Sequence, residues 1–196
     1  MLIDFDKIEA LQRYFLMANT VVPRPIAWVL TEGEVLNIAP FSFFTPVSSE
    51  PATVMISIGH RDNGIPKDTL RNLRESKKCV ICIVDEDHFA SMHLSSKGLE
   101  PNQSELDAFD IPTQTVLDDF PPMPKGIKVA LFGEYLQEVD LKGSKTIPVI
   151  VEVKHLYIDD VIISDTEKIS LEFYAIARVG RSYRRLGDKL TAPEIV

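Results

Sequence analysis

The chain has 196 residues, a net charge of −8 at pH 7 and a pI of about 5.0, with 45% hydrophobic and 26% charged residues. This acidity argues against a nucleic-acid-binding protein, because affinity for nucleic acid comes mainly from Lys and Arg that neutralise phosphates. The length predicts one domain over residues 1–196. Without a membrane-length apolar run or a signal peptide, we expect a cytoplasmic protein with no membrane partner.

The chain begins with a helical pattern and continues mainly with strands. Ile8, Leu11 and Phe15 lie at helical spacing and predict a helix over residues 8–17, capped by Asp4 or Asp6. Apolar runs typical of strands follow at IAWVL (26–30), LNIAPF (36–41), ATVMISIG (52–59), CVICIV (79–84), residues 127–141, residues 146–159 and VIISDTE (161–167).

A second helix is expected directly after residues 60–67. Asp68 is the predicted N-cap, and Leu70 and Leu73 lie on one face. The helical segments are short and lie between strands, which favours a mainly β fold, an antiparallel barrel with peripheral α-helices, over a doubly wound sheet.

The two cysteines have the spacing C-x-x-C within an apolar run. Positions i and i+3 of a strand point to opposite faces, so Cys79 and Cys82 are predicted to be packed, reduced thiols. A redox pair normally opens a helix, and a zinc site needs two further ligands.

Prolines are concentrated in the segment from residue 21 to residue 51. Proline is expected at strand starts, edges and bulges, so Pro40 is predicted to interrupt the strand of NIAPFSFF. Backbone groups released at such a break are able to bind a flat, polar molecule, with Ser42 as a hydrogen-bonding group and phenylalanines as walls. A core strand with an aromatic plug is the alternative.

Two further segments carry charge where an anion would bind. Lys67 and Thr69 stand at the predicted start of a helix, where free N–H groups and the helix dipole favour a phosphate. Arg24 lies between two prolines, and such a stiff backbone suits a bidentate grip on a phosphate or carboxylate. A capped surface helix and a surface ion pair are the respective alternatives.

Local support for side-chain catalysis is missing from the sequence. The four histidines are scattered and have no metal-ligand spacing, and neither G-x-S-x-G nor G-x-G-x-x-G occurs. His93, within SMHLSS, is the histidine of most interest. We therefore assign no catalytic side chain and no metal site.

Taken in order, several motifs resemble one known family. PRPIAWVLTEGEVLNIAPFSFFTPVSSEP (23–51), KDTLRN (67–72) and ARVGRSY (177–183) are similar to the flavin reductase-like family of FMN-binding split barrels, in the subgroup that includes flavoredoxin. The resemblance covers most of the chain and implies an antiparallel, Greek-key type split barrel that binds FMN.

The resemblance also implies where FMN would bind. It places the isoalloxazine ring on the interrupted strand and the phosphate near the KDT element, with Arg24 in the phosphate or ribityl region. The FMN-binding residues that it implies are Arg24, Asn37, Ile38, Ala39, Ser42, Phe43, Phe44, Ser57, Lys67, Asp68, Thr69 and Asn72. It further implies a homodimer in which Arg178 and Tyr183 reach the flavin of the partner chain.

The activity implied is that of an FMN-dependent oxidoreductase. NADH or NADPH would be the electron donor, and free flavin, a quinone-like molecule or an iron protein the acceptor. Two alternatives remain open. One is an FMN-containing electron-transfer protein without its own NAD(P)H turnover, and the other is a non-catalytic barrel that holds haem or another flat ligand.

Overall fold

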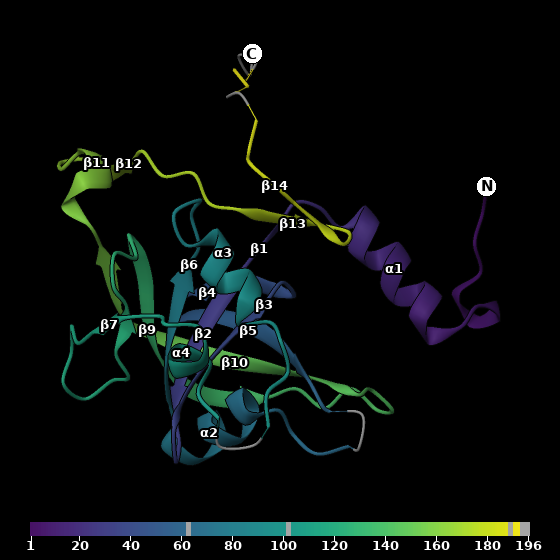
Figure 1. The fold of residues 1–196 in the computed structure, drawn as a ribbon. Coiled ribbons are helices and arrows are strands. Elements are labelled where there is room, and N and C mark those ends of the chain that lie inside the picture. Colours follow the sequence, from purple (N-terminus) through teal and green to yellow (C-terminus); the bar gives the residue numbers. More distant parts are fainter. Residues whose placement is uncertain (62–63, 101–102, 188–189, 193–196) are drawn as a thin grey trace.

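The body of the protein is a seven-stranded antiparallel sheet. The computed structural model describes residues 1–61, 64–100, 103–187 and 190–192 (Figure 1). The strand order is β3-β2-β6-β9-β10-β5-β4. Its strands are β2 (Ala27–Glu32), β3 (Leu36–Phe41), β4 (Phe44–Ser49), β5 (Ala52–Gly59), β6 (Lys78–Ile83), β9 (Val129–Glu138) and β10 (Thr146–Ile158). All pairings within it are antiparallel, as predicted.

The two edges of this sheet are consecutive in the chain. β3 and β4 are the terminal strands of the order, yet only Ser42 and Phe43 separate them. A two-residue link spans at most about 10 Å, so it brings the two edges together at one corner. The backbone N–H of Ser57 on β5 donates to the carbonyl of Phe43 over 2.8 Å and fixes this corner, which we call the seam (Ser42–Phe43).

The predicted break at Pro40 was placed too early. β3 continues through Pro40 to Phe41, and Pro40 lies opposite Trp28 of β2. Proline lacks an N–H but is tolerated on an edge strand, where one side of the backbone has no neighbouring strand. The interruption therefore falls at the seam.

Alternate residues of the sheet build two separate hydrophobic clusters. Trp28 and Leu30 belong to one cluster, and Ala27 and Val29 to the other. Cys79 packs in the second cluster and Cys82 in the first, and both thiols are free and fully buried. The prediction of packed, reduced thiols on opposite faces is confirmed.

The first helix differs from the prediction. α1 spans Ala10–Thr20, because Glu9 and Gln12 form a capping box. Asp4 instead caps the short 3-10 helix η1 (Phe5–Lys7). The expected apolar face does not enter the core: Leu11 is 62% exposed, and Ala18 alone in α1 is buried. Figure 1 shows α1 projecting away from the sheet.

The second helix packs as expected, but it begins one residue earlier than predicted. α2 spans Asp68–Ser76 with Lys67 at the N-cap, and Leu70 and Leu73 are fully buried in the second cluster. α3 (Phe89–Leu94) and α4 (Glu105–Ala108) contact β3.

Smaller sheets complete the fold. β1 (Arg24–Pro25), β13 (Ala177–Val179) and β14 (Ser182–Arg184) form a three-stranded sheet. β7 (Thr113–Gln114) pairs with β8 (Met123–Pro124), and β11 (Ile163–Asp165) with β12 (Ser170–Leu171). The strand expected over 161–167 is shorter than predicted and covers only β11, because the chain first turns in a second 3-10 helix, η2 (Asp160–Ile162), which Asp159 caps.

Candidate functional site

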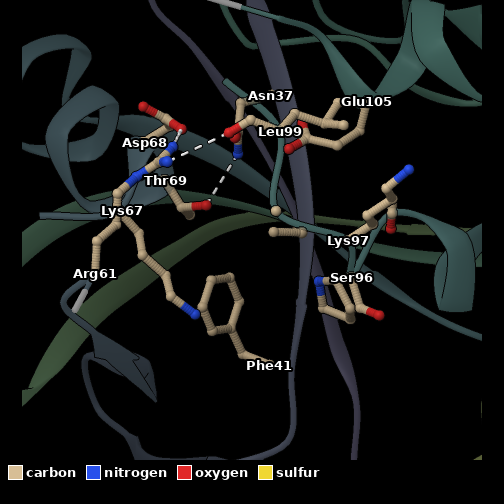
Figure 2. Close-up of a pocket in the computed structure, with 14 residues that line it drawn as sticks. Asn37, Phe41, Arg61, Lys67, Asp68, Thr69, Ser96, Lys97, Leu99 and Glu105 are labelled. Carbon is tan, nitrogen blue, oxygen red and sulfur yellow. Dashed lines mark hydrogen bonds and ion pairs between the residues drawn. The ribbon is translucent and has the colours of Figure 1, made fainter. Parts of the chain in front are cut away.

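A cavity of about 160 Å³ lies between the edge strand β3 and the start of α2 (Figure 2). Asn37 and Ala39 line it from β3, and residues 67–69 line it from the other side. β3 is the outer strand of the sheet here, so its free edge faces this space. The structure thus brings together two segments that the sequence singled out separately.

A hydrogen bond joins these two segments. The amide Nδ2 of Asn37 donates to Oγ1 of Thr69 over 2.9 Å, and both residues are buried. A buried polar pair of this kind fixes relative position, because leaving either group unpaired is costly. The strand edge and the helix start are therefore held in one arrangement.

The start of α2 offers donors for an anion. No side chain caps it, and the N–H groups of Leu70 and Arg71 both bond to the carbonyl of Lys67. Within the described residues, the N–H groups of Asp68 and Thr69 have no acceptor. Free N–H groups and the positive end of the helix dipole favour a phosphate.

Lys67 adds an uncompensated positive charge at the same place. Its Nζ lies 6.0 Å from the centroid of the Phe41 ring, inside the cavity, and no carboxylate of the described ranges pairs with it. Asp68, by contrast, is neutralised by ion pairs to Arg61 and to Arg71, the latter over 2.9 Å. The cavity therefore keeps a net attraction for an anion despite the Asp68 carboxylate.

Glu105 closes the far side of this cavity. Its Oε2 accepts the backbone N–H of Ile38 over 3.2 Å. Burial raises the pKa of the Glu105 carboxyl above its ordinary value, and hydrogen bonds from the backbone oppose this rise only partly. The Ile38 side chain itself points into the hydrophobic core and is fully buried, so any contact of Ile38 with a ligand would involve the backbone.

A second group of candidate residues lines a different cavity, of about 310 Å³. Ser42, Phe43, Phe44 and Ser57 line it at the seam together with Arg24. The space is bounded mainly by apolar side chains, which suits a flat ring more than a phosphate.

Arg24 is largely occupied by the protein itself. Its guanidinium donates to the carbonyls of Ala18, Val21 and Gly180, which links the end of α1 to the turn between β13 and β14. Burial lowers the pKa of Arg24. Its Nε is buried and has no partner within the described part of the chain, so one donor remains for a ligand.

A third cavity, of about 220 Å³, lies between the other two, and we call it the connecting cavity. It shares Pro40 and Phe41 with the first and Ser42 with the second. The three adjoining cavities therefore follow the chain from the start of α2 around the seam. The connecting cavity is also lined by Tyr14, His93, Arg178 and Tyr183.

Sequence reasoning singled out His93 without giving it a role, and gave Arg178 and Tyr183 only as contacts to a partner chain. In the structure, Nδ1 of His93 and the hydroxyl of Tyr183 are 3.1 Å apart, and the Arg178 guanidinium lies 4.3 Å from the centre of the Tyr183 ring. Tyr14 lies on α1, and nothing in the sequence beyond helical spacing marked it as a site residue.

Asn72 lies outside these cavities. It is buried beneath the turn after β2, where its Nδ2 donates to Oγ1 of Thr31 over 3.4 Å. A side chain at Gly33 would collide with it, because a Cβ there would come within 2.5 Å of Oδ1 of Asn72. The assignment of Asn72 to a cofactor stays a prediction, and its contacts are those of a structural residue.

The described part of the chain contains no group of His, Cys, Asp and Glu that is able to hold a metal ion. None of its helices has the length and apolar character needed to cross a membrane.

Comparisons with known proteins place the chain in a family. The family model described as "Flavin reductase like domain" matches residues 17–172. An uncharacterized protein of Aquifex aeolicus is 32% identical over 173 residues, which is 87% of each chain.

Solved structures match over almost the whole chain. Nitrilotriacetate monooxygenase component B from Bacillus cereus has a TM-score of 0.90 at 24% identity, covering 98% of both chains. The 2-nitrobenzoate 2-nitroreductase NbaA from Pseudomonas fluorescens has a TM-score of 0.88 at 26% identity, covering 100% of this chain and 98% of that one. The predicted split-barrel fold is confirmed, and the family match together with the likeness to NbaA supports a flavin-related oxidoreductase.

Proposed function

The chain belongs to the flavin reductase-like family, and on that premise we propose that it binds FMN and uses NADH or NADPH as electron donor. The single observation that carries the proposal is the pair of cavities at the start of α2 and at the seam, which share the neighbourhood of β3. The first lies at a helix start that favours an anion and the second between aromatic and apolar walls, as the phosphate and the ring of a flavin mononucleotide require.

The residues present fit such a group. The free N–H groups of Asp68 and Thr69 and the charge of Lys67 would hold the phosphate. Phe43, Phe44 and Ser42 would border the ring at the seam. The unpartnered Nε of Arg24 would serve a polar atom of the same ligand.

The chemistry divides between cofactor and protein. Bound FMN supplies hydride acceptance and electron delivery to a small-molecule acceptor. The protein binds and orients the ring, presents backbone donors to its polar edge, and leaves one face open to the second substrate. No side chain needs to act as an acid or a base in this scheme.

The proposal includes a homodimer in the cytoplasm. α1 projects from the sheet with Leu11 and Met17 exposed, and Val21 directly after it is exposed too. Met17 and Val21 also line the apolar cavity at the seam. A second copy would cover this surface. Light scattering after size exclusion should give a dimer for the wild type and a monomer for Leu11→Lys. Leu171→Lys, on an exposed leucine of β12, is the control and should stay dimeric.

The test of the function is the visible spectrum of the purified protein, loaded with FMN and mixed anaerobically with NADH or NADPH. We expect a flavin spectrum that bleaches with one or both donors. A flavin spectrum that persists with both would indicate the electron-transfer alternative. A failure to take up FMN would disprove the proposal.

A further inference from the structure

The connecting cavity contains a cation that the protein leaves unpaired. Arg178 lines this cavity and is half-buried. No carboxylate in the described ranges pairs with its guanidinium. Arg24 lies near enough for its charge and that of Arg178 to repel each other. In a chain with a net charge of −8, two neighbouring arginines without an acidic partner create a local site for an anion.

The position of Arg178 leaves its donors available. Its Nε donates to the carbonyl of Gly180 over 3.3 Å, and its face lies over the Tyr183 ring at 4.3 Å. Stacking occupies the face of a guanidinium and leaves the N–H groups in its plane. Those in-plane groups match the two oxygens of a carboxylate.

The other walls of this cavity are flat. Tyr183 is held by an edge-on contact with Phe89, whose ring centre is 4.9 Å away, and by the His93 imidazole. Tyr14, which stacks against Phe43, and Phe41 supply further rings. A planar aromatic molecule fits such walls better than a branched or polar one.

From these two observations we propose that the cavity of Tyr14, Phe41, His93, Arg178 and Tyr183 binds a planar aromatic carboxylate. The aromatic ring lies between the flat side chains, and its carboxylate binds Arg178. Because this cavity adjoins the two cavities that we assign to FMN, such a molecule is placed next to the flavin as the second substrate. That last step rests on the proposed function, whereas the binding itself does not.

The test measures binding rather than turnover. We would titrate the purified protein with benzoate by calorimetry, and with benzyl alcohol as a neutral molecule of similar shape. We expect benzoate to bind at least about tenfold more tightly, since a charge-assisted bidentate contact contributes on the order of 1.5–3 kcal/mol. Arg178→Gln should abolish this preference, and Arg178→Lys should keep only part of it.

The matched control is Arg184→Gln, on the same hairpin but outside the cavity, which should bind benzoate like the wild type. Equal binding of benzoate and benzyl alcohol, no binding of benzoate, or an unchanged preference in Arg178→Gln would each overturn the proposal. The proposal would also be overturned if inorganic phosphate displaced benzoate at equal concentration, because the site would then recognise phosphoryl groups. A separate FMN titration tests the proposed function, so a failure of benzoate binding is distinguishable from a failure of FMN binding.

Discussion

Asn37 on the edge strand β3 donates its side-chain amide to Thr69 in the first turn of α2, over 2.9 Å. The two residues are 32 positions apart in the chain and both are buried. This one contact sets the distance between the backbone edge of β3 and the free N–H groups at the helix start. The geometry of the candidate phosphate site therefore depends on it.

Thr69→Val should destabilise the protein by about 1–3 kcal/mol, because valine keeps the shape but leaves the Asn37 amide buried without an acceptor. FMN affinity should fall as well, since the helix start is no longer fixed. Urea unfolding and a flavin fluorescence titration measure the two effects. Thr69→Ser keeps a hydroxyl at the same position and should restore most of both, so a serine variant as impaired as valine would contradict this account.

Lys67→Ala should weaken FMN binding by roughly 10- to 100-fold, which corresponds to a charge-assisted contact of about 1.5–3 kcal/mol. Stability should change little, because Lys67 is exposed and has no ion-pair partner among the described residues. Lys142→Ala, an exposed lysine in the loop between β9 and β10, is the control. Equal affinities in both variants would remove Lys67 from the phosphate site.

Asn72→Ala should behave in the opposite way. Its contacts lie with Thr31 and beneath Gly33, so we expect a loss of about 1–2 kcal/mol in unfolding free energy with FMN affinity unchanged. Thermal unfolding and flavin titration of the same preparation separate these effects. A variant of wild-type stability that fails to bind FMN would make Asn72 a cofactor residue after all.

Glu105→Gln should stabilise the protein at pH 8. The folded-state pKa of Glu105 is raised by burial, so stability is lost as pH rises from the unfolded pKa through the folded one. Glutamine still accepts the Ile38 N–H and removes the buried charge. Urea unfolding between pH 4 and pH 8 should show an advantage that grows with pH, and the exposed Asp107→Asn in the same helix should show none. A constant advantage at every pH would rule out charge as the cause.

Both cysteines should be inert in the folded protein. Burial raises the pKa of Cys79 to about 12 and that of Cys82 still higher, so neither forms a thiolate near neutral pH. A thiol reagent such as Ellman's reagent should react with neither in buffer and with both in guanidinium chloride. Rapid reaction in buffer would mean that the sheet opens readily around β6.

Much of the sheet could be predicted from the sequence because short apolar runs of strand length carry their own signal. β5 over Ala52–Gly59 begins and ends where the pattern ATVMISIG predicts. α1 was misplaced because the capping box of Glu9 and Gln12 determines its start, and its apolar residues face outward from the barrel. Periodicity alone does not say whether an apolar face is covered by the same chain.

Only part of the candidate site could be predicted from the sequence, for a different reason. Lys67 and Thr69 indicate a helix start from the local sequence, but the hydrogen bond from Asn37 to Thr69 depends on tertiary structure. Arg178, His93 and Tyr183 meet across 90 residues of chain and form no motif together. The role of Arg24 was hidden likewise, since its acceptors are backbone carbonyls that any residue type supplies.

The two strands that meet at the seam also affect how this sheet avoids growth by aggregation. Its two open edges are β3 and β4, and an open edge is a template for a strand from another molecule. Each edge carries a proline, Pro40 and Pro46, which removes a ladder donor, and Glu105 takes the Ile38 N–H. The prolines of the two edge strands thus hinder the pairing of either edge with a strand from another molecule.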